Sequence, residues 1–267
     1  MIWSGIIAPM VNGLVQAAWI PRLEQEVHRC LNGESSGHDP WHAFRVRDLA
    51  IRIAHAVGAD VEVVHAAALL HDIGHVSGRG EHARRGASLA ADLLSSCSFP
   101  VDKVRSVTSC IEQHDWLPGR AGDPQSPTLE YQAFADADRL DALGAIGIAR
   151  TFAFGGAHSR PIWDPEPNTA AQGPYGVSSI HHFYDKLLRL PGDMYTEPGR
   201  RLAARRVAVM EEFLRTFNLQ WDGKDAEAAA PYPEPHVSLG SFSKRSVKIG
   251  DRIRRIFAAI LQPNPIN

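Results

Sequence analysis

Cysteine is scarce in this chain of 267 residues, which contains only Cys30, Cys97 and Cys110. Their number is odd and no two of them have CxxC spacing, which argues against a disulfide framework and against a zinc site built from thiolates. So low a cysteine content is typical of proteins in a reducing compartment. We therefore expect an intracellular, cytoplasmic protein.

The sequence also lacks a long apolar run and a strong excess of one charge. The first residues, MIWSGIIAPMVNGLVQAAWIP, are mildly apolar, but Pro9, Asn12 and Gly13 interrupt them well short of the ~20 residues that a membrane-spanning helix needs. The formal net charge of −2 gives no general attraction to phosphate backbones, so no nucleic-acid partner is expected. A small anionic ligand would need a local basic site.

Two catalytic signatures are absent as well. No GxxxxGK[ST] loop occurs, so a nucleotide would have to bind as a substrate, through a metal and basic side chains. No nucleophile elbow or other local signature supports Ser/His/Asp or Cys/His chemistry.

No segment shows the alternation of polar and apolar residues that marks a β-strand, whereas signals for helices recur along the chain. The clearest is Asp39-Pro40 before WHAFRVRDLAIRIAHAV, with Gly58 after it: a capping side chain, a proline at the first helical position and a glycine stop. Asp60 opens a second helix, and further helices are expected over EHARRGASLAADLLSS, residues 101–114, residues 129–149, SIHHFYDKLLRL and GRRLAARRVAVMEEFLRTF. With 44% hydrophobic residues the chain can bury one substantial core, so the predicted class is an all-α helical bundle.

Changes in composition predict three regions: an N-terminal arm over residues 1–22, a catalytic domain over 23–221, and a tail over 222–267. Residues 155–176 are rich in Pro, Gly and Asn and predict a long loop within the domain. The tail contains the segment KRSVKIGDRIRRIFAAILQP, where apolar residues at helical spacing lie among basic ones. We expect a basic amphipathic helix that packs on the body or on a second subunit, or that contacts a membrane surface or a partner.

The segment LLHDIGH, at residues 69–75, places His71 and Asp72 side by side at the end of an apolar helix. Both side chains bind metals in their unprotonated forms. His42 lies on the preceding helix and the carboxylates of DADRLDALGA on a later one, so one imidazole and one carboxylate from these places would complete a His, His, Asp, Asp set. Such mixed ligation suits Mn²⁺, Fe²⁺, Ni²⁺, Zn²⁺ or a loosely held Mg²⁺.

The segments HDPWHAFRVRDLA, AAALLHDIGH, IEQHD and ADADRLDALGAIGIARTFAFGG, in this order, resemble the HD superfamily of metal-dependent phosphohydrolases. The last of them, with HHFYDKLLRL and RRLAARRVAVMEEFL, is similar to its bacterial YedJ-like branch. The resemblance implies an HD-domain helical bundle, and the metal ligands it implies are His42, His71, Asp72 and Asp138. Asp136 is the alternative to Asp138, since residues two apart on a helix face different sides and only one can reach the ion.

The resemblance further implies one or two divalent ions. His82 of EHARRGASLA and His114 of IEQHD match second-metal positions of two-metal relatives, in which case Asp72 would bridge the two ions. The alternatives are a surface histidine for His82 and a phosphate-binding histidine for His114.

The expected activity is the hydrolysis of a phosphoester or phosphoanhydride, with a nucleotide as the substrate that the resemblance implies. Catalytic candidates are Asp72, Glu81 and Asp115, and the candidates for contacting phosphate oxygens are Arg45, Arg139 and Lys186. Ligands alone do not separate a hydrolase from an HD-fold di-iron oxygenase, because the metal and the pocket make that difference. A third alternative is a non-catalytic, metal-stabilised module that senses a ligand.

Overall fold

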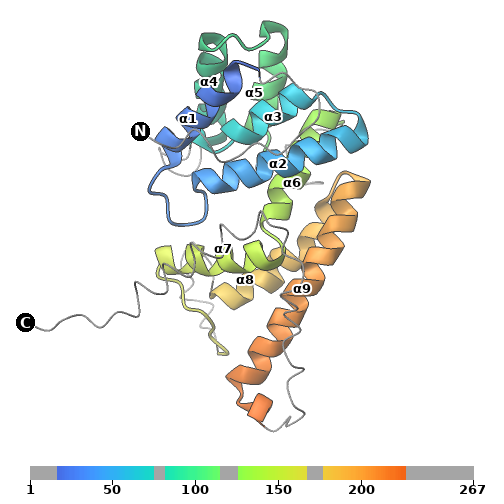
Figure 1. Ribbon diagram of the computed structural model, residues 1–267. Helices are drawn as coiled ribbons and strands as arrows, with labels where there is room; N and C mark the ends of the chain where they lie inside the picture. Colours follow the sequence, from blue (N-terminus) through green and yellow to red (C-terminus); the bar gives the residue numbers. More distant parts are fainter. Residues whose placement is uncertain (1–16, 75–81, 115–125, 167–176, 227–267) are drawn as a thin grey trace, which may run out of the picture. The chain divides into compact units, whose positions relative to one another are not determined.

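The computed structural model describes residues 17–74, 82–114, 126–166 and 177–226, and the regular structure in these ranges is entirely helical (Figure 1). The predicted all-α class is therefore confirmed. The α-helices are α1 (Trp19–Leu31), α2 (Pro40–Val57), α3 (Val61–Leu70), α4 (His82–Ser96), α5 (Val104–Glu112), α6 (Leu129–Asp141), α7 (Gly144–Ala157), α8 (Ser179–Asp185) and α9 (Glu197–Trp221). Short 3₁₀ turns cover Val101–Lys103, Leu187–Asp193 and Lys224–Ala226.

Two compact units divide the chain. The first spans residues 1–218 and contains every described residue of the candidate site; the second spans 219–267, of which residues 219–226 are described. The predicted C-terminal amphipathic helix lies outside the described residues. Among the residues described, no helix has the length and apolar character needed to cross a membrane.

Side-chain caps set the limits of α2 and α3 where the sequence predicted them. The Asp39 carboxylate accepts the backbone N–H of His42 at 2.9 Å, and Gly58 ends α2 with a left-handed φ of 76°. Asp60 then caps α3 by accepting the N–H of Glu62 at 3.0 Å. The two helices thus follow each other closely, and they pack side by side.

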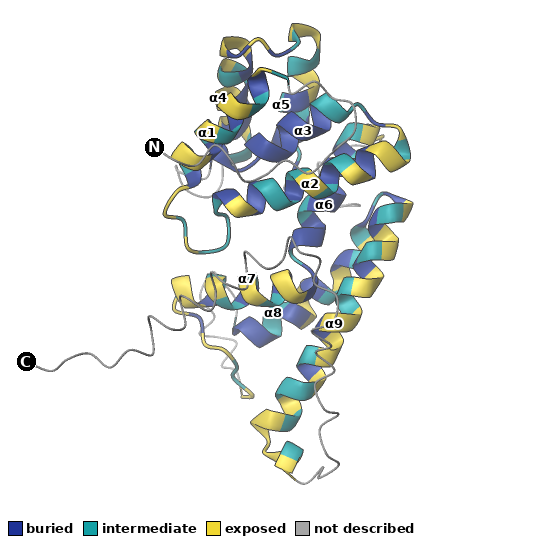
Figure 2. Ribbon diagram, in the orientation of Figure 1, coloured by how far each residue is buried: buried dark blue, intermediate teal, exposed yellow. Residues whose placement is uncertain are grey.

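Helix α3 is the centre of the core. Each residue from Val63 to Leu70 is buried, and α1, α2, α5 and α6 pack against this helix, which Figure 2 shows almost wholly in the buried colour. Because α3 is enclosed along its length, its C-terminal end opens inside the body and not at the surface. The two residues that follow it, His71 and Asp72, are accordingly buried as well.

The prediction of one helix over residues 129–149 is wrong, because the chain turns between α6 and α7. Gly144 adopts a φ of 72°, a left-handed conformation that glycine tolerates best, and the chain leaves in a new direction from there. Helix α7 then runs on to Ala157, so the predicted loop at residues 155–176 begins later than expected.

Asp136 ties the start of α9 to α6. Its buried carboxylate accepts hydrogen bonds from the N–H of Tyr195 at 2.8 Å and from the N–H and hydroxyl of Thr196 at 2.8 and 2.6 Å. Further along α9, Arg206 donates to the Leu140 carbonyl. Asp136 therefore attaches α9 to α6. The candidate site uses a different face of α6.

The N-terminal limit of the packed body lies further upstream than the predicted boundary after residue 22. Helix α1 already begins at Trp19, whose ring is buried and makes edge-to-face contacts with His65 and Phe99, each at 5.1 Å between centroids. An aromatic side chain of this size buries enough apolar surface to hold its segment against the core.

Candidate metal centre

Two of the predicted ligands owe their positions to helix ends. His42 lies in the first turn of α2, where the Asp39 cap and Pro40 set the start of the helix. His71 follows directly on α3, and its Nδ1 donates to the Ala68 carbonyl at 2.9 Å. The imidazoles meet with their Nε2 atoms 3.1 Å apart.

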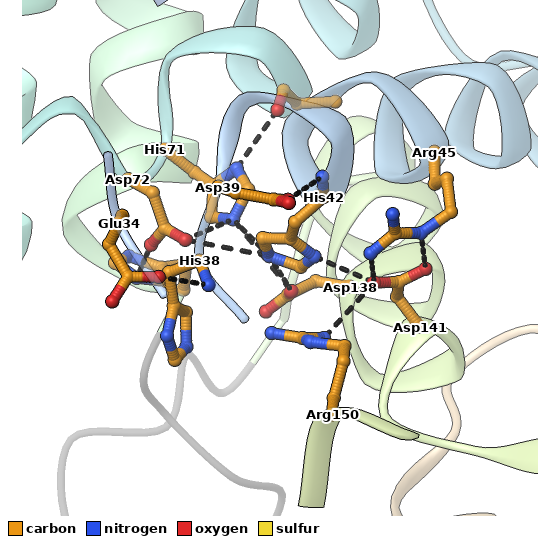
Figure 3. A network of polar contacts seen from close by, with 12 residues as sticks. Glu34, His38, Asp39, His42, Arg45, His71, Asp72, Asp138, Asp141 and Arg150 are labelled. Atoms are coloured by element: carbon orange, nitrogen blue, oxygen red, sulfur yellow. Dashed lines mark hydrogen bonds and ion pairs between the residues drawn. The ribbon is translucent and has the colours of Figure 1, made fainter. Parts of the chain in front are cut away.

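Two carboxylates join this pair (Figure 3). Asp72 Oδ2 lies 3.4 Å from His42 Nε2 and 3.3 Å from His71 Nε2. From α6, Asp138 Oδ1 lies 3.4 Å from His42 Nε2 and 3.8 Å from His71 Nε2. Asp138 exposes 25% of its side chain, against 3% or less for the other three, so the cluster opens to solvent on the side of Asp138. The structure thus brings together His42, His71, Asp72 and Asp138.

The donor set fits a divalent cation. Carbonyl and carboxylate oxygens only accept, so the Nδ1 atoms of His71 and His42 both carry hydrogen, the latter bound to Asp141 Oδ2 at 2.8 Å. At a separation of 3.1 Å, at most one of the two Nε2 atoms can also carry a hydrogen. Lone pairs of imidazole nitrogen and carboxylate oxygen therefore converge on one point, which is what a metal ion requires of its ligands.

The charges of the cluster are strongly coupled. Burial by itself disfavours the charged forms, but the carboxylate of Asp72 outweighs it and raises the pKa of His71 to about 9. Burial likewise opposes ionisation of Asp72, yet the neighbouring His71 and His42 hold its pKa well below the usual range. Burial also opposes ionisation of Asp138, and contacts with the same two histidines lower its pKa. An ionised carboxylate buried as deeply as that of Asp72 calls for positive charge beside it.

Asp141 orients His42 and is one of the site residues to which the sequence analysis gave no role. Besides accepting from His42 Nδ1, it accepts from Arg45 Nε and Nη2 at 2.8 and 2.9 Å and from Arg150 Nη1 at 3.1 Å. Burial opposes its ionisation, but its bonds to His42 and Arg45 lower its pKa. A carboxylate behind a ligand histidine fixes the ring and its tautomer and makes it a better ligand. The spacing could have indicated this role, since Asp141 lies three residues after Asp138 and so on a neighbouring part of the α6 surface.

The two histidines predicted for a second ion lie beside the first group. His114 Nε2 is 3.9 Å from Asp72 Oδ1, the carboxylate oxygen other than the one that contacts His42 and His71. The His114 ring lies 5.6 Å from that of His71 and 5.3 Å from that of His82, between centroids. His114 Nδ1 donates to the Ile111 carbonyl at 2.7 Å, so the ring is held with Nε2 toward Asp72.

Of the remaining predicted residues, Arg45 lies beside the cluster, and the others lie elsewhere or outside the described ranges. Arg45 uses two nitrogens on Asp141. Arg139 is buried, with its Nη1 3.8 Å from Asp136 Oδ1 and its guanidinium over the Tyr195 ring. Lys186 is exposed at the end of α8. Glu81 and Asp115 lie outside the described residues.

Histidines and aspartates from α2, α6 and the end of α3 meet inside this helical body. Such an arrangement is typical of a class of helical metal-binding proteins. Residues 41–143 match the model of the HD domain. The chain is 35% identical over 203 residues to the uncharacterized protein YpgQ of Bacillus subtilis strain 168, a match that covers 76% of this chain and 94% of YpgQ. The chain therefore belongs to the HD-domain superfamily.

Solved structures share this fold. The crystal structure of B. subtilis YpgQ in complex with ADP superposes with a TM-score of 0.61 at 30% identity, over 76% of this chain and 94% of that one. An HD-superfamily hydrolase of Bacillus thuringiensis gives a TM-score of 0.59 at 33% identity, over 76% and 96% of the two chains. A protein of Lactobacillus plantarum gives 0.61 at 29% identity, over 79% and 100%. The fold is that of HD-superfamily hydrolases.

Proposed function

We propose that this protein is a metal-dependent phosphohydrolase that cleaves a phosphoester or phosphoanhydride bond of a nucleotide. The observation that carries the proposal is the convergence of His42 Nε2, His71 Nε2, Asp72 Oδ2 and Asp138 Oδ1, all within 3.8 Å in the pairs that join imidazole to carboxylate. Four protein ligands leave coordination positions of a divalent ion open to water and to a substrate oxygen.

The protein residues have separable parts in this chemistry. His42, His71, Asp72 and Asp138 hold the ion, and Asp141 keeps the His42 ring in its binding orientation. A bound divalent ion polarises a phosphoryl oxygen, lowers the pKa of a water molecule and neutralises charge that develops on phosphorus. The partial exposure of Asp138 marks the side from which substrate and water enter.

A second ion is part of the proposal. Asp72 turns one oxygen toward His42 and His71 and the other toward His114, the arrangement that a bridging carboxylate needs. His114 and His82 would hold the second ion together with Asp72. Two ions sharing a carboxylate can stabilise both the attacking and the leaving oxygen of a phosphoryl transfer.

A nucleotide is the proposed substrate because the related YpgQ has been crystallised with ADP. The site also supplies cationic groups next to the ligand cluster, since Arg45 and Arg150 both bind Asp141. Guanidinium groups are well suited to phosphate oxygens.

The test compares three variants after loading with Mn²⁺ and after loading with Fe²⁺. Asp72→Ala should abolish both metal binding and hydrolysis across a panel of nucleotides and sugar phosphates, since one oxygen of Asp72 lies within 3.4 Å of both His42 and His71 and the other faces His114. His82→Ala should lower the metal content from two ions per chain to one. Asp48→Ala is the control, because Asp48 exposes 63% of its side chain and pairs with Arg47 on the surface.

Turnover retained in Asp72→Ala would refute the site, and an unchanged metal content in His82→Ala would refute the second ion. Consumption of O₂ by the iron-loaded protein, without phosphate release, would favour the oxygenase alternative.

A further inference from the structure

Arg150 reaches the candidate metal centre from a helix that the sequence did not connect with it. It lies on α7, beyond the turn at Gly144, and its Nη1 donates to Asp141 Oδ2 at 3.1 Å. The same oxygen accepts from His42 Nδ1 at 2.8 Å. One carboxylate oxygen therefore fixes both a metal ligand and a guanidinium, and Figure 3 shows Arg45 and Arg150 approaching Asp141 from different helices.

The two arginines that bind Asp141 differ in how many of their hydrogen-bond donors remain available to a ligand. Arg45 forms a fork, with Nε on one carboxylate oxygen and Nη2 on the other. Arg150 uses Nη1 alone, and within the described part of the chain its Nε and Nη2 have no acceptor. A guanidinium with two neighbouring donors still available matches two oxygens of a phosphate group.

The charges around Arg150 also favour a role in binding an anion. Among the ion pairs of the described residues, Arg150 has Asp141 as its partner and shares that carboxylate with Arg45, which also lies close to the charge of Asp39. The Arg150 side chain is 16% exposed, which leaves it partly desolvated but reachable. A cation held in such a setting binds an anion more strongly than one that is fully hydrated at the surface.

The loop before α2 is shaped to lie against this guanidinium. A Cβ atom at Gly37 would come within 3.2 Å of Arg150 Nε and 3.3 Å of its Cγ, and Gly37 has a φ of 102° that favours glycine. The Glu34 carboxylate holds the loop by accepting the N–H of Ser36 at 2.8 Å and that of His38 at 2.7 Å. Arg150 is thus confined between a fixed loop and Asp141, so little conformational entropy remains to be lost when it binds a ligand.

We propose that Arg150 forms an anion subsite of the metal centre, which binds phosphate oxygens of a di- or triphosphate substrate beside the bound ion. The proposal rests on the phosphohydrolase function proposed above and names a substrate-contacting residue for it. Arg45, one of the phosphate contacts predicted from the sequence, already uses its Nε and Nη2 on Asp141.

The experiment uses the full chain loaded with Mn²⁺ and the variants Arg150→Gln, Arg150→Lys and Arg52→Gln. Calorimetry measures the affinity of each for pyrophosphate, ADP and adenosine, and a metal titration measures the affinity for Mn²⁺. Arg52 is the matched control, since it is exposed on α2 and the described residues offer it no side-chain partner.

Arg150→Gln should bind pyrophosphate and ADP about 10- to 100-fold more weakly, the loss expected for hydrogen bonds to a charged group. Its affinities for adenosine and for Mn²⁺ should match those of the wild type. Arg150→Lys should recover part of the loss, because lysine restores the charge without the paired donors. Arg52→Gln should behave as the wild type.

The inference is overturned if Arg150→Gln binds pyrophosphate as the wild type does, or if its Mn²⁺ affinity falls as much as its pyrophosphate affinity, which would make Arg150 a support for Asp141 alone. In both cases a wild type that hydrolyses nucleotides leaves the proposed function standing. A wild type that neither binds pyrophosphate or ADP nor hydrolyses any ester refutes the proposed function together with the subsite.

Discussion

At the scale of single residues, Asp141 connects the metal centre with the basic groups around it. Asp141 Oδ2 accepts hydrogen bonds from His42, Arg45 and Arg150, and Oδ1 accepts a second hydrogen bond from Arg45. A carboxylate that orients a ligand histidine and neutralises part of an arginine cluster has two effects that a mutation should separate. Removing its charge loosens the His42 ring without removing a ligand.

Asp141→Asn should lower the affinity for Mn²⁺ by about 10- to 100-fold, the usual effect of losing a partner that orients a ligand. The amide keeps the shape of the carboxylate, but only one of its two polar groups accepts hydrogen bonds, so His42 and Arg45 can no longer both be satisfied. Competition with a chelating dye measures the affinity, and Asp48→Asn on the surface is the control. Equal affinity in the variant and the wild type would show that His42 is held without Asp141.

The sequence predicted the metal-ligand residues better than the residues that hold those side chains in place. His71 and Asp72 stood out as adjacent ligand residues at the end of an apolar helix, and the resemblance to the HD superfamily selected His42 and Asp138 to complete the set. The structure brings the four together. Arg150 had no such signal, since its position depends on the left-handed turn at Gly144 that separates α6 from α7. One glycine within a helical pattern does not disclose where the next helix will point.

At the scale of helices, the packing of α1 on α3 includes an ionisable group. His65 is buried on α3 with its ring against Trp19, and its Nε2 has no hydrogen-bond partner in the described part of the chain. Burial, with a smaller contribution from the charge of Arg47, lowers the pKa of His65 to about 3. The contact between the two helices therefore depends on a neutral imidazole.

This burial predicts a loss of stability in mild acid. The unfolded chain protonates His65 below about pH 6.5 and the native protein does so only near pH 3, so between these values the unfolded state binds more protons and stability falls with the pH. From pH 7 to pH 5, the unfolding free energy of the wild type should fall by about 2 kcal/mol more than that of His65→Phe, whose ring cannot be protonated.

Urea denaturation in the presence of a chelator measures this difference without contributions from metal binding. Parallel pH profiles for the two proteins would mean that His65 is protonated in the native state.

Helix limits were predictable where a side chain or a glycine sets them locally. Asp39, Gly58 and Asp60 fix the ends of α2 and the start of α3 through contacts within a few residues, and these limits agree with the prediction. The start of α1 was missed because Trp19 belongs to the body through its contacts with His65 and Phe99, which lie far along the chain. Contacts between distant segments leave no local pattern to read.

At the scale of the whole molecule, metal binding and folding should be linked, because the ligands come from segments far apart in the chain. His42, His71 and Asp138 approach one another only in the folded state, so an ion that binds them stabilises that state. All three belong to the compact unit of residues 1–218. The linkage should therefore not depend on the predicted tail over residues 222–267.

Mn²⁺ at about 100 times its dissociation constant should stabilise the full-length protein by about 2.7 kcal/mol, which corresponds to a rise in Tm of about 5–10 °C. A chain that ends at Trp221 should show the same rise and the same hydrolysis. Full-length Asp72→Ala should show no rise, which controls for unspecific effects of the ion. Thermal unfolding with chelator and with added Mn²⁺ measures all three proteins, and a shortened chain that is insoluble or no longer responds to Mn²⁺ would show that the tail is needed to form the metal centre.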